Sequence, residues 1–260
     1  MLSIIIASTS YINLEKCLKS IKEDNVEVIV NNANEDLNIS DLINKYRFIE
    51  INKKTNILES RYITGIMASG EYTIIMDDSR FFAKDFFSRL NLINLDIGVI
   101  NELEEQNTSY DKLINRQIKI NYNSNIDPKN NMFLLPRIYK TCILQRALKN
   151  IKNSLPNTLF KNIKAMDLEL IYYEAYEISN NIKRLNDNYI IHASQDIIKE
   201  IKKFYKYGKN TRLLKSTKYA HIGQVNSRIR KPNNIEDIFV LLLVYTIRGI
   251  PFLLGYILNS

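Results

Sequence analysis

The chain has few cysteines and histidines, which limits the chemistry open to it. Its two cysteines, Cys17 and Cys142, lack the spacing of metal ligands or of a redox pair. We therefore expect both to be small core residues in a reducing compartment. The sequence shows no internal repeat and no low-complexity linker. Met1 leads directly into an apolar run without a basic leader, so we expect no signal peptide.

Acidic residues are scarce near one end of the chain. The 260 residues carry 36 Lys or Arg against 28 Asp or Glu, giving a formal net charge of +8, and 45% are hydrophobic. Eleven of the basic residues fall within 199–231, where Glu200 is the one acid. So one-sided a block indicates an anionic partner. The phosphates of a membrane surface are one candidate, and RNA is another because Tyr205, Tyr207 and Tyr219 are interleaved with the charges.

Apolar runs and helical stripes alternate along the first hundred residues. The predicted strands are 3–7, 26–30, 48–51 and 72–76. Two predicted helices begin after caps at Asn13 and Ser40, and two more cover 58–68 and 82–90. Strands and helices at this spacing predict a parallel α/β sheet with right-handed crossovers, the kind that binds nucleotides.

The pattern is weaker beyond residue 100. We predict strands over 117–120 and 132–135, an exposed Asn-rich loop over 121–131, and a helix over 138–148. A helical stripe that begins at Asp167 and a short strand over 189–192 follow.

Two adjacent carboxylates, Asp77 and Asp78, end the strand predicted over 72–76. Ligands of open α/β sheets lie at the carboxyl ends of strands, and uncovered carboxylates there commonly hold a cation or a ligand's hydroxyl groups. The alternative is that Asp77 caps the next helix and Asp78 is solvated.

A third carboxylate, Asp167, opens a predicted helix and is either its cap or a general base at the edge of a cleft. Glu169 lies two residues along that helix, so we expect it to point to a different face and not to share the role. His192, one of two histidines, ends a predicted strand and is either structural or a ligand.

A series of short motifs carries a resemblance to a known family. In chain order they are Ser3–Ile6, Leu14–Ile21, Val28–Val30, Asn56 with Arg61, Ala68–Tyr72, Met76–Ser79, Asp167–Leu170 and His192. Together they resemble family 2 glycosyltransferases of the GT-A fold. The segment Phe204–Lys209 with Arg212–Leu214 is similar to the basic segment after the catalytic domain of many bacterial and archaeal members.

The resemblance implies a role for each matching residue. It implies that Asp77 and Asp78 hold the ribose and diphosphate of a nucleotide-sugar, the latter through Mg²⁺ or Mn²⁺, and that Asp167 is the catalytic base. His192 matches a position that helps to hold the metal or the diphosphate in some members. The remaining residues implied to bind the donor are Ala7, Ser8, Asn31, Asn32, Asn56 and Arg61.

The sequence departs from the family pattern in three motifs. Asn31 and Asn32 stand where an aspartate usually binds the base, and Met166 stands where a glutamate usually precedes the catalytic base. Ser79 replaces a carboxylate of the acidic motif, so Asp78 would have to supply the metal ligand. These departures leave the metal and the donor undecided.

The apolar stretch 239–258 has the length of a transmembrane helix, about 20 residues. Arg248 lies in its middle, where insertion into lipid costs roughly 2.5–3.5 kcal/mol, and Gly249 and Pro251 would break a helix. We therefore predict two short helices in the membrane interface or a shallow hairpin. The alternatives are a buried helical pair that closes the core, or a dimer interface.

The sequence thus predicts a GT-A-type (Rossmann-like), mostly parallel α/β sheet flanked by helices, with a basic and apolar C-terminal appendage. The expected domains are 1–198, with a donor half over 1–100 and an acceptor half over 101–198, and 199–260. The predicted function is an inverting glycosyltransferase that acts on a glycan or polyprenyl-linked acceptor at the cytoplasmic membrane face. A non-catalytic nucleotide-sugar-binding relative and a basic RNA-binding protein are the alternatives, nucleic acid being the less favoured partner.

Overall fold

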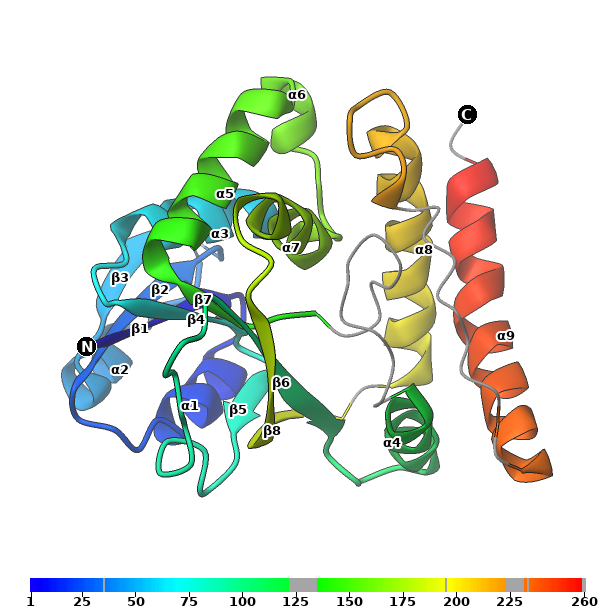
Figure 1. The fold of residues 1–260 in the computed structure, drawn as a ribbon, viewed down its shortest axis with the longest axis horizontal. Coiled ribbons are helices and arrows are strands. Elements are labelled where there is room, and N and C mark those ends of the chain that lie inside the picture. Colours follow the sequence, from blue (N-terminus) through cyan, green and yellow to red (C-terminus); the bar gives the residue numbers. More distant parts are fainter. Residues whose placement is uncertain (35, 122–134, 195, 223–231, 233, 259–260) are drawn as a thin grey trace.

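The computed structural model describes residues 1–34, 36–121, 135–194, 196–222, 232 and 234–258. In these residues eight strands form one sheet (Figure 1). Their order across the sheet is β3 (Ile49–Asn52), β2 (Val26–Asn32), β1 (Leu2–Ser8), β4 (Tyr72–Asp77), β7 (Ile138–Lys140), β6 (Ile97–Glu104), β8 (Ile182–His192) and β5 (Arg80–Phe82).

The first four strands in this order are parallel, and β8 is parallel to β6. β7 is antiparallel to both of its neighbours, and β5 is antiparallel to β8. The helices that connect the strands are α1 (Tyr11–Lys19), α2 (Ser40–Tyr46), α3 (Ile57–Met67), α4 (Ser109–Asn121), α5 (Thr141–Ser154), α6 (Asn157–Phe160) and α7 (Asp167–Ile178). The predicted α/β class with a mostly parallel sheet is confirmed.

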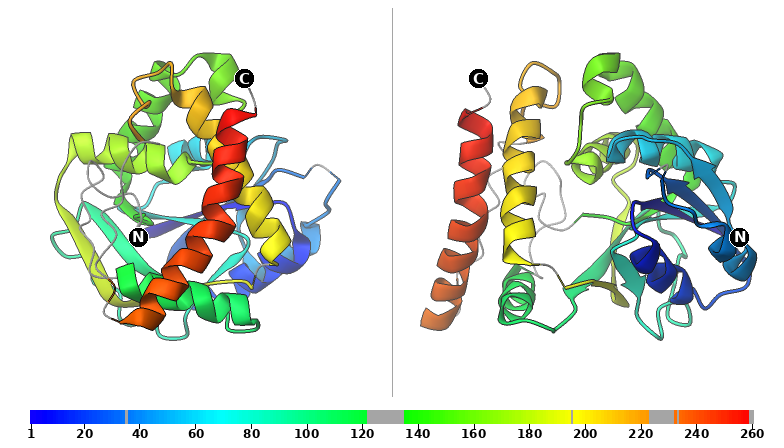
Figure 2. Two further views of the ribbon diagram at one scale, coloured as in Figure 1. Left: turned by 90° about the vertical axis from the view of Figure 1, so that its right-hand side faces the viewer. Right: turned by 180° about the vertical axis from the view of Figure 1, so that it is seen from behind.

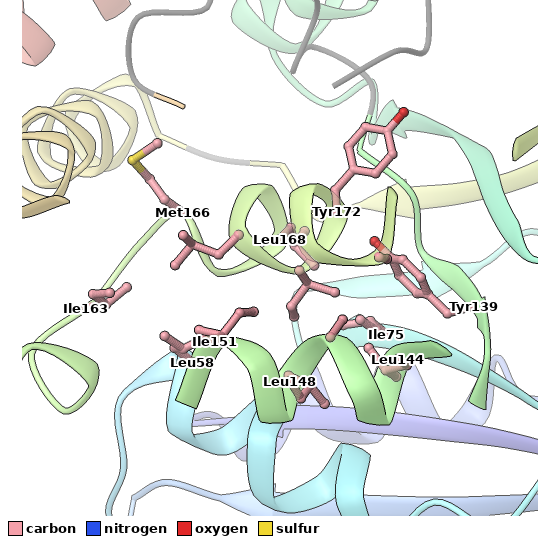
Figure 3. Close-up of a cluster of buried hydrophobic side chains, with 14 of the residues drawn as sticks. Leu58, Ile75, Tyr139, Leu144, Leu148, Ile151, Ile163, Met166, Leu168 and Tyr172 are labelled. Carbon is pink, nitrogen blue, oxygen red and sulfur yellow. The ribbon is translucent and has the colours of Figure 1, made fainter. Parts of the chain in front are cut away.

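Helices cover both faces of the parallel part of the sheet. Every residue of β1 is buried, as its unbroken apolar run predicts. Ile4 belongs to the core on the side of α1 and α2, and Ile5 belongs to the core on the side of α3, α5 and α7. On that second side, Leu58 of α3, Leu148 of α5 and Leu168 of α7 lie close together (Figure 3). These contacts attach α7, and with it Asp167, to the parallel half of the fold.

The C-terminal part consists of α8 (Ile197–Leu214) and α9 (Ile235–Ile257), which run side by side in the same direction beside the sheet (Figures 1 and 2). α9 lies outermost. The two backbones approach closely at two glycines: a Cβ on Gly208 would lie 1.9 Å from the Phe252 carbonyl oxygen, and one on Gly255 would lie 2.0 Å from that of Tyr205.

Several predicted elements differ from the structure. The helix predicted over 82–90 is absent: residues 80–82 extend the sheet by pairing with β8, and residues 84–89 form hydrogen-bonded turns. Asp77 therefore caps no helix there. Residues 117–120 are the end of α4 and not a strand, because Leu113 and Ile120, seven residues apart on one side of the helix, pack against Val240 and Leu241 of α9. Of the strand predicted over 132–135, residues 132–134 lie outside the described residues.

Other differences concern where helices begin. The helix predicted from 138 begins at Thr141, because residues 138–140 pair with β4 and β6. Ser10, and not Asn13, caps α1 by accepting a hydrogen bond from the Asn13 N–H. Cys17 is buried as expected, but Cys142 is exposed at the start of α5.

The apolar stretch is one continuous helix and not two, with Pro251 inside it. Arg248 explains why this helix tolerates a charge: its Nη2 donates to Glu200 of α8 (2.6 Å) and its Nη1 donates to Gln117 of α4 (2.9 Å). Packing along α8 offsets the roughly 3 kcal/mol that a proline inside a helix costs.

Candidate active site

The carboxyl end of the sheet borders a cavity of about 970 Å³. Asp77 at the end of β4 and Glu102 at the end of β6 line it, together with Asp167 and Glu169 from the first turn of α7. Residues of α4, α8 and α9 complete the lining. The cavity therefore lies where the parallel half of the fold, the mixed half and the C-terminal helices meet.

Arg61 of α3 connects Asp77, predicted to bind the donor and a metal, with Asp167, the predicted catalytic base. Its side chain is 1% exposed; Nη2 donates to Asp77 Oδ1, Nη1 donates to the Met76 carbonyl, and Nε lies 3.4 Å from Asp167 Oδ2. Burial lowers the pKa of Arg61 to about 10 against the opposing effect of Asp167, so it remains charged at neutral pH. Arg61 thus holds the end of β4 and the start of α7 in one arrangement.

Two more arginines surround Asp77. Arg80 Nη1 donates to Asp77 Oδ2, and Arg137 Nη1 lies 3.7 Å from the same oxygen. Both arginines also bind Glu102, at 2.6 and 3.0 Å. Burial would raise the pKa of Glu102, but Arg137 and Arg80 outweigh it and hold that pKa well below its usual range. Asp77 is thus enclosed by three guanidinium groups.

Asp78 is turned toward the loop between β1 and α1. Its Oδ2 accepts hydrogen bonds from Ser8 Oγ (3.1 Å), Thr9 N (2.7 Å) and Ser10 N (3.0 Å). These three hydrogen bonds to one carboxylate oxygen fix the conformation of the loop between β1 and α1.

His192 is 2% exposed and its Nδ1 lies 2.8 Å from Glu104 Oε2. Burial, then Arg80, lowers the pKa of His192 against the pull of Glu104, so we expect a neutral imidazole at pH 7. His192 lines the same cavity as Asp77.

Glu169, two positions along α7 from Asp167, lines the same cavity. Burial, and then the charge of Asp167, raises the pKa of Glu169 to about 7. Met166, directly before Asp167, has φ 70° and ψ 17°. A bulky side chain rarely adopts this left-handed conformation, which recurs at functional sites. Thr211 Oγ1 of α8 contacts its sulfur at 3.0 Å.

The residues predicted to bind the nucleotide lie on neighbouring strand ends. Ala7 pairs with Asn31 on one side and with Asp77 on the other, and Ser8 pairs with Asn32. Asn31 is fully buried; its Nδ2 donates to Thr55 Oγ1 (2.9 Å), while its Oδ1 has no hydrogen-bond partner among the described residues. A buried acceptor without a donor is rare.

The side-chain amides of Asn32 and Asn56 already form hydrogen bonds within the chain. Asn32 Nδ2 donates to the Leu37 carbonyl (2.8 Å). Asn56 caps α3 and donates to the Phe160 carbonyl (2.8 Å). Of the predicted site residues, the cavity lining brings together Asp77, Asp167 and His192, and the others lie on the adjoining strand ends or on α3.

The described side chains do not suit a divalent ion as they stand. Among them, no three His, Cys, Asp or Glu side chains lie in an arrangement that could hold a metal. Asp77 is bound by arginines, Asp78 accepts N–H groups, and position 79 is a serine. Mg²⁺ and Mn²⁺ need oxygens that are free to coordinate.

Sequence reasoning missed Arg80, Glu102, Glu104 and Arg137. Arg80 directly follows the acidic motif, and Glu102 and Glu104 alternate at the end of a strand that we did not predict. That alternation was the available signal. Arg137 carries no local signal, because only the pairing of β7 with β4 and β6 brings it to the cavity.

The predicted GT-A-type fold, with a Rossmann-like parallel half, a mixed half and a carboxylate-bearing cavity where they meet, is confirmed by the solved structures that the chain matches. Among solved structures, S. aureus TarS residues 1–349 matches with a TM-score of 0.57 and 15% identity, covering 98% of this chain and 81% of that one. Its complex with UDP-GlcNAc matches with a TM-score of 0.53 and 16% identity, over 86% and 70% of the two chains.

A second enzyme has the same fold. The mannosyltransferase PcManGT from Pyrobaculum calidifontis, in complex with GDP-Man and Mn²⁺, matches with a TM-score of 0.56 and 12% identity, over 95% of this chain and 73% of that one. Neither a family model nor a curated protein matches the sequence. At these identities the similarity shows the fold, and activity has to be argued from the site.

Proposed function

We propose that this chain transfers a sugar from a nucleotide-sugar to a hydroxyl group of a glycan or lipid-linked acceptor, with inversion at the anomeric carbon. The observation that carries the proposal is the arrangement of Asp77 and Asp167. These carboxylates lie at the end of β4 and at the start of α7, share Arg61 and line one cavity. The UDP-GlcNAc and GDP-Man bound by the two neighbours support a nucleotide-sugar as the donor.

The nucleoside would lie over the ends of β1 and β2. Ala7, Ser8 and the asparagines of β2 border that place, and the unpartnered Oδ1 of Asn31 offers an acceptor for an N–H group of the base. The diphosphate and sugar would then extend past Asp77 into the cavity. Ligands of open α/β sheets occupy this edge in general.

The transfer is a single displacement. The acceptor oxygen forms a bond to the anomeric carbon while its proton passes to a carboxylate of the cavity. The bond from that carbon to the diphosphate breaks, and its electron pair leaves on the phosphate oxygen. Asp167 is the proton acceptor in this proposal, because it lines the cavity and its ion pair with Arg61 fixes its position.

The C-terminal helices support an acceptor at a membrane. α9 is long and apolar enough to cross a membrane by length and composition. In the fold its outer side leaves large apolar side chains uncovered, with Phe239, Leu242, Leu253 and Ile257 between 55% and 67% exposed. Exposed apolar surface of this extent marks an interaction site. The proposed location is the cytoplasmic membrane face, with the outer side of α8 and α9 against lipid.

The test of the function is Asp167→Asn, assayed for transfer from UDP- and GDP-sugars. The amide keeps the size of the carboxylate and removes its basicity, so we expect transfer to fall by about 10²- to 10⁴-fold. Nucleotide affinity should change little. The melting temperature should fall because buried Arg61 loses one of its charge partners, so transfer is compared at a temperature where both proteins are folded.

Three other outcomes would contradict parts of this proposal. Transfer by Asp167→Asn at the wild-type rate would show that Asp167 is not the base. Nucleotide-sugar binding without turnover by the wild-type chain would identify a non-catalytic relative. Salt-sensitive binding of RNA together with no affinity for any nucleotide-sugar would favour the RNA-binding alternative.

A further inference from the structure

The cavity is bordered by a row of lysines that the displacement step does not use. Lys199, Lys202, Lys203 and Lys206 occupy positions i, i+3, i+4 and i+7 of α8, a spacing that places them on one side of the helix. All four line the cavity. Part of the basic block therefore faces the interior of the site rather than the proposed membrane.

Few carboxylates lie close to the ammonium groups of these four lysines. Within the described part of the chain, the ammonium group of Lys203 is the only one of the four with a carboxylate inside 4 Å, that of Glu200 at 3.6 Å. Glu200 also binds Arg248 at 2.6 Å. The pKa of Lys203 is lowered by burial first, and Arg80 and Arg248 add to this effect against the pull of Glu200. An added anion would relieve this excess of positive charge.

Arg137 gives a second, independent indication of a ligand. Its side chain is 3% exposed and lines the cavity, yet its Nε and Nη1 have no hydrogen-bond partner among the described residues. Buried N–H groups are nearly always hydrogen-bonded in native proteins. The forked guanidinium suits the two oxygens of a phosphate group.

The carboxylates predicted to bind a metal, Asp77 and Asp78, already have partners within the chain. Asp77 is enclosed by Arg61, Arg80 and Arg137, so a divalent cation beside it would meet three positive charges at short range. Asp78 closes the loop after β1.

We propose that the lysine row of α8, together with Arg80 and Arg137, binds the diphosphate of the donor directly and takes the place of a divalent metal ion. This inference rests on the proposed function. When the bond from the sugar to the diphosphate breaks, the electron pair adds negative charge to the phosphate oxygens. Fixed ammonium and guanidinium groups stabilise that charge without a metal.

The test measures binding of UDP and GDP to the full chain in detergent by calorimetry, once in EDTA and once in Mn²⁺. The nucleotide that binds is expected to bind equally well in both. The double variant Lys202→Gln/Lys206→Gln should weaken it about tenfold or more, because hydrogen bonds between charged groups are lost. Lys209→Gln is the matched control, because Lys209 is exposed on the same helix and does not line the cavity.

Each other result separates this inference from the proposed function. Binding of nucleoside diphosphate only in Mn²⁺ would overturn the metal-free site and leave the transferase intact. Metal-free binding that the double variant and Lys209→Gln weaken equally would place the diphosphate elsewhere and also overturn it. No binding of either nucleotide in EDTA or Mn²⁺, with no turnover, would overturn both.

Discussion

Asp167 and Glu169 line the same cavity but have different environments. Asp167 has an ion pair with Arg61, whereas Glu169 Oε2 is buried without a hydrogen-bond partner among the described residues. Burial and the adjacent Asp167 raise the pKa of Glu169 to about 7 from a usual value of 4.5. In the unfolded chain this carboxyl would ionise near its usual value.

This difference makes stability depend on pH. Between pH 4.5 and 7 the native state keeps a proton on Glu169 that the unfolded chain releases, so stability falls as the pH rises. Glu169→Gln removes this titration. We expect the variant to be roughly 1–3 kcal/mol more stable than wild type at pH 8, with no such gain near pH 4.5.

Thermal melts at the two pH values measure the effect. Glu23→Gln is the control, because Glu23 is exposed. A gain from Glu169→Gln of the same size at both pH values would show that the native carboxyl ionises normally.

At the scale of elements, the close approach of α8 and α9 depends on glycine. An added Cβ on Gly255 would lie 2.0 Å from the carbonyl oxygen of Tyr205, and a backbone atom cannot move away by changing rotamer. The helices would have to separate, which would also shift Arg248 away from Glu200.

Gly255→Ala should therefore destabilise the protein by roughly 1–3 kcal/mol through overpacking, although alanine favours a helix. Gly249→Ala is the matched control in the same helix. Nothing lies within 4 Å of its Cβ position, so we expect a gain of roughly 0.5–1 kcal/mol. Thermal melting in detergent and limited proteolysis of the C-terminal helices measure both. Equal effects of the two substitutions would argue against tight packing at Gly255.

At the scale of the whole molecule, α9 has two distinct sides. Its inner side adds Tyr245, Arg248 and Phe252 to the cavity lining and packs on α8 and α4. Figure 2 shows that α9 lies on the outside of the molecule, and the side chains on its outer side form the uncovered apolar surface. The inner side of α9 thus lines the site, and its outer side is a surface on which a partner can bind.

Substitution of the outer side tests which partner it meets. Leu242→Asp/Leu253→Asp should reduce co-sedimentation with anionic liposomes by at least about tenfold, because each leucine loses roughly 1.5–3 kcal/mol of apolar burial. Ile93→Asp is the control, because Ile93 is 73% exposed outside these helices. Unchanged liposome binding, together with conversion of a dimer to a monomer, would identify the outer side as a dimer interface.

Local patterns were sufficient for the parallel half of the fold. The strand predicted over 3–7 lies within β1, and those over 26–30 and 72–76 lie within β2 and β4, because strands covered on both faces consist mainly of apolar residues. The carboxyl ends of these strands lie side by side, so that Ala7 pairs with Asp77 of the acidic motif on one side and with Asn31 on the other. This alignment follows from parallel pairing alone.

Tertiary structure decided the rest. Residues 117–120 are helical because α9 covers them, and Arg248 is accepted in an apolar helix because Glu200 and Gln117 bind it. Such contacts join residues far apart in the chain, so no local periodicity contains them.

The charges around the site were likewise decided by the tertiary structure. The sequence determined that Asp77 ends a strand, but only the packing of α3, β5 and β7 surrounds it with arginines. A carboxylate's capacity for metal depends on which charges lie within a few ångströms, and that distance is set by the fold.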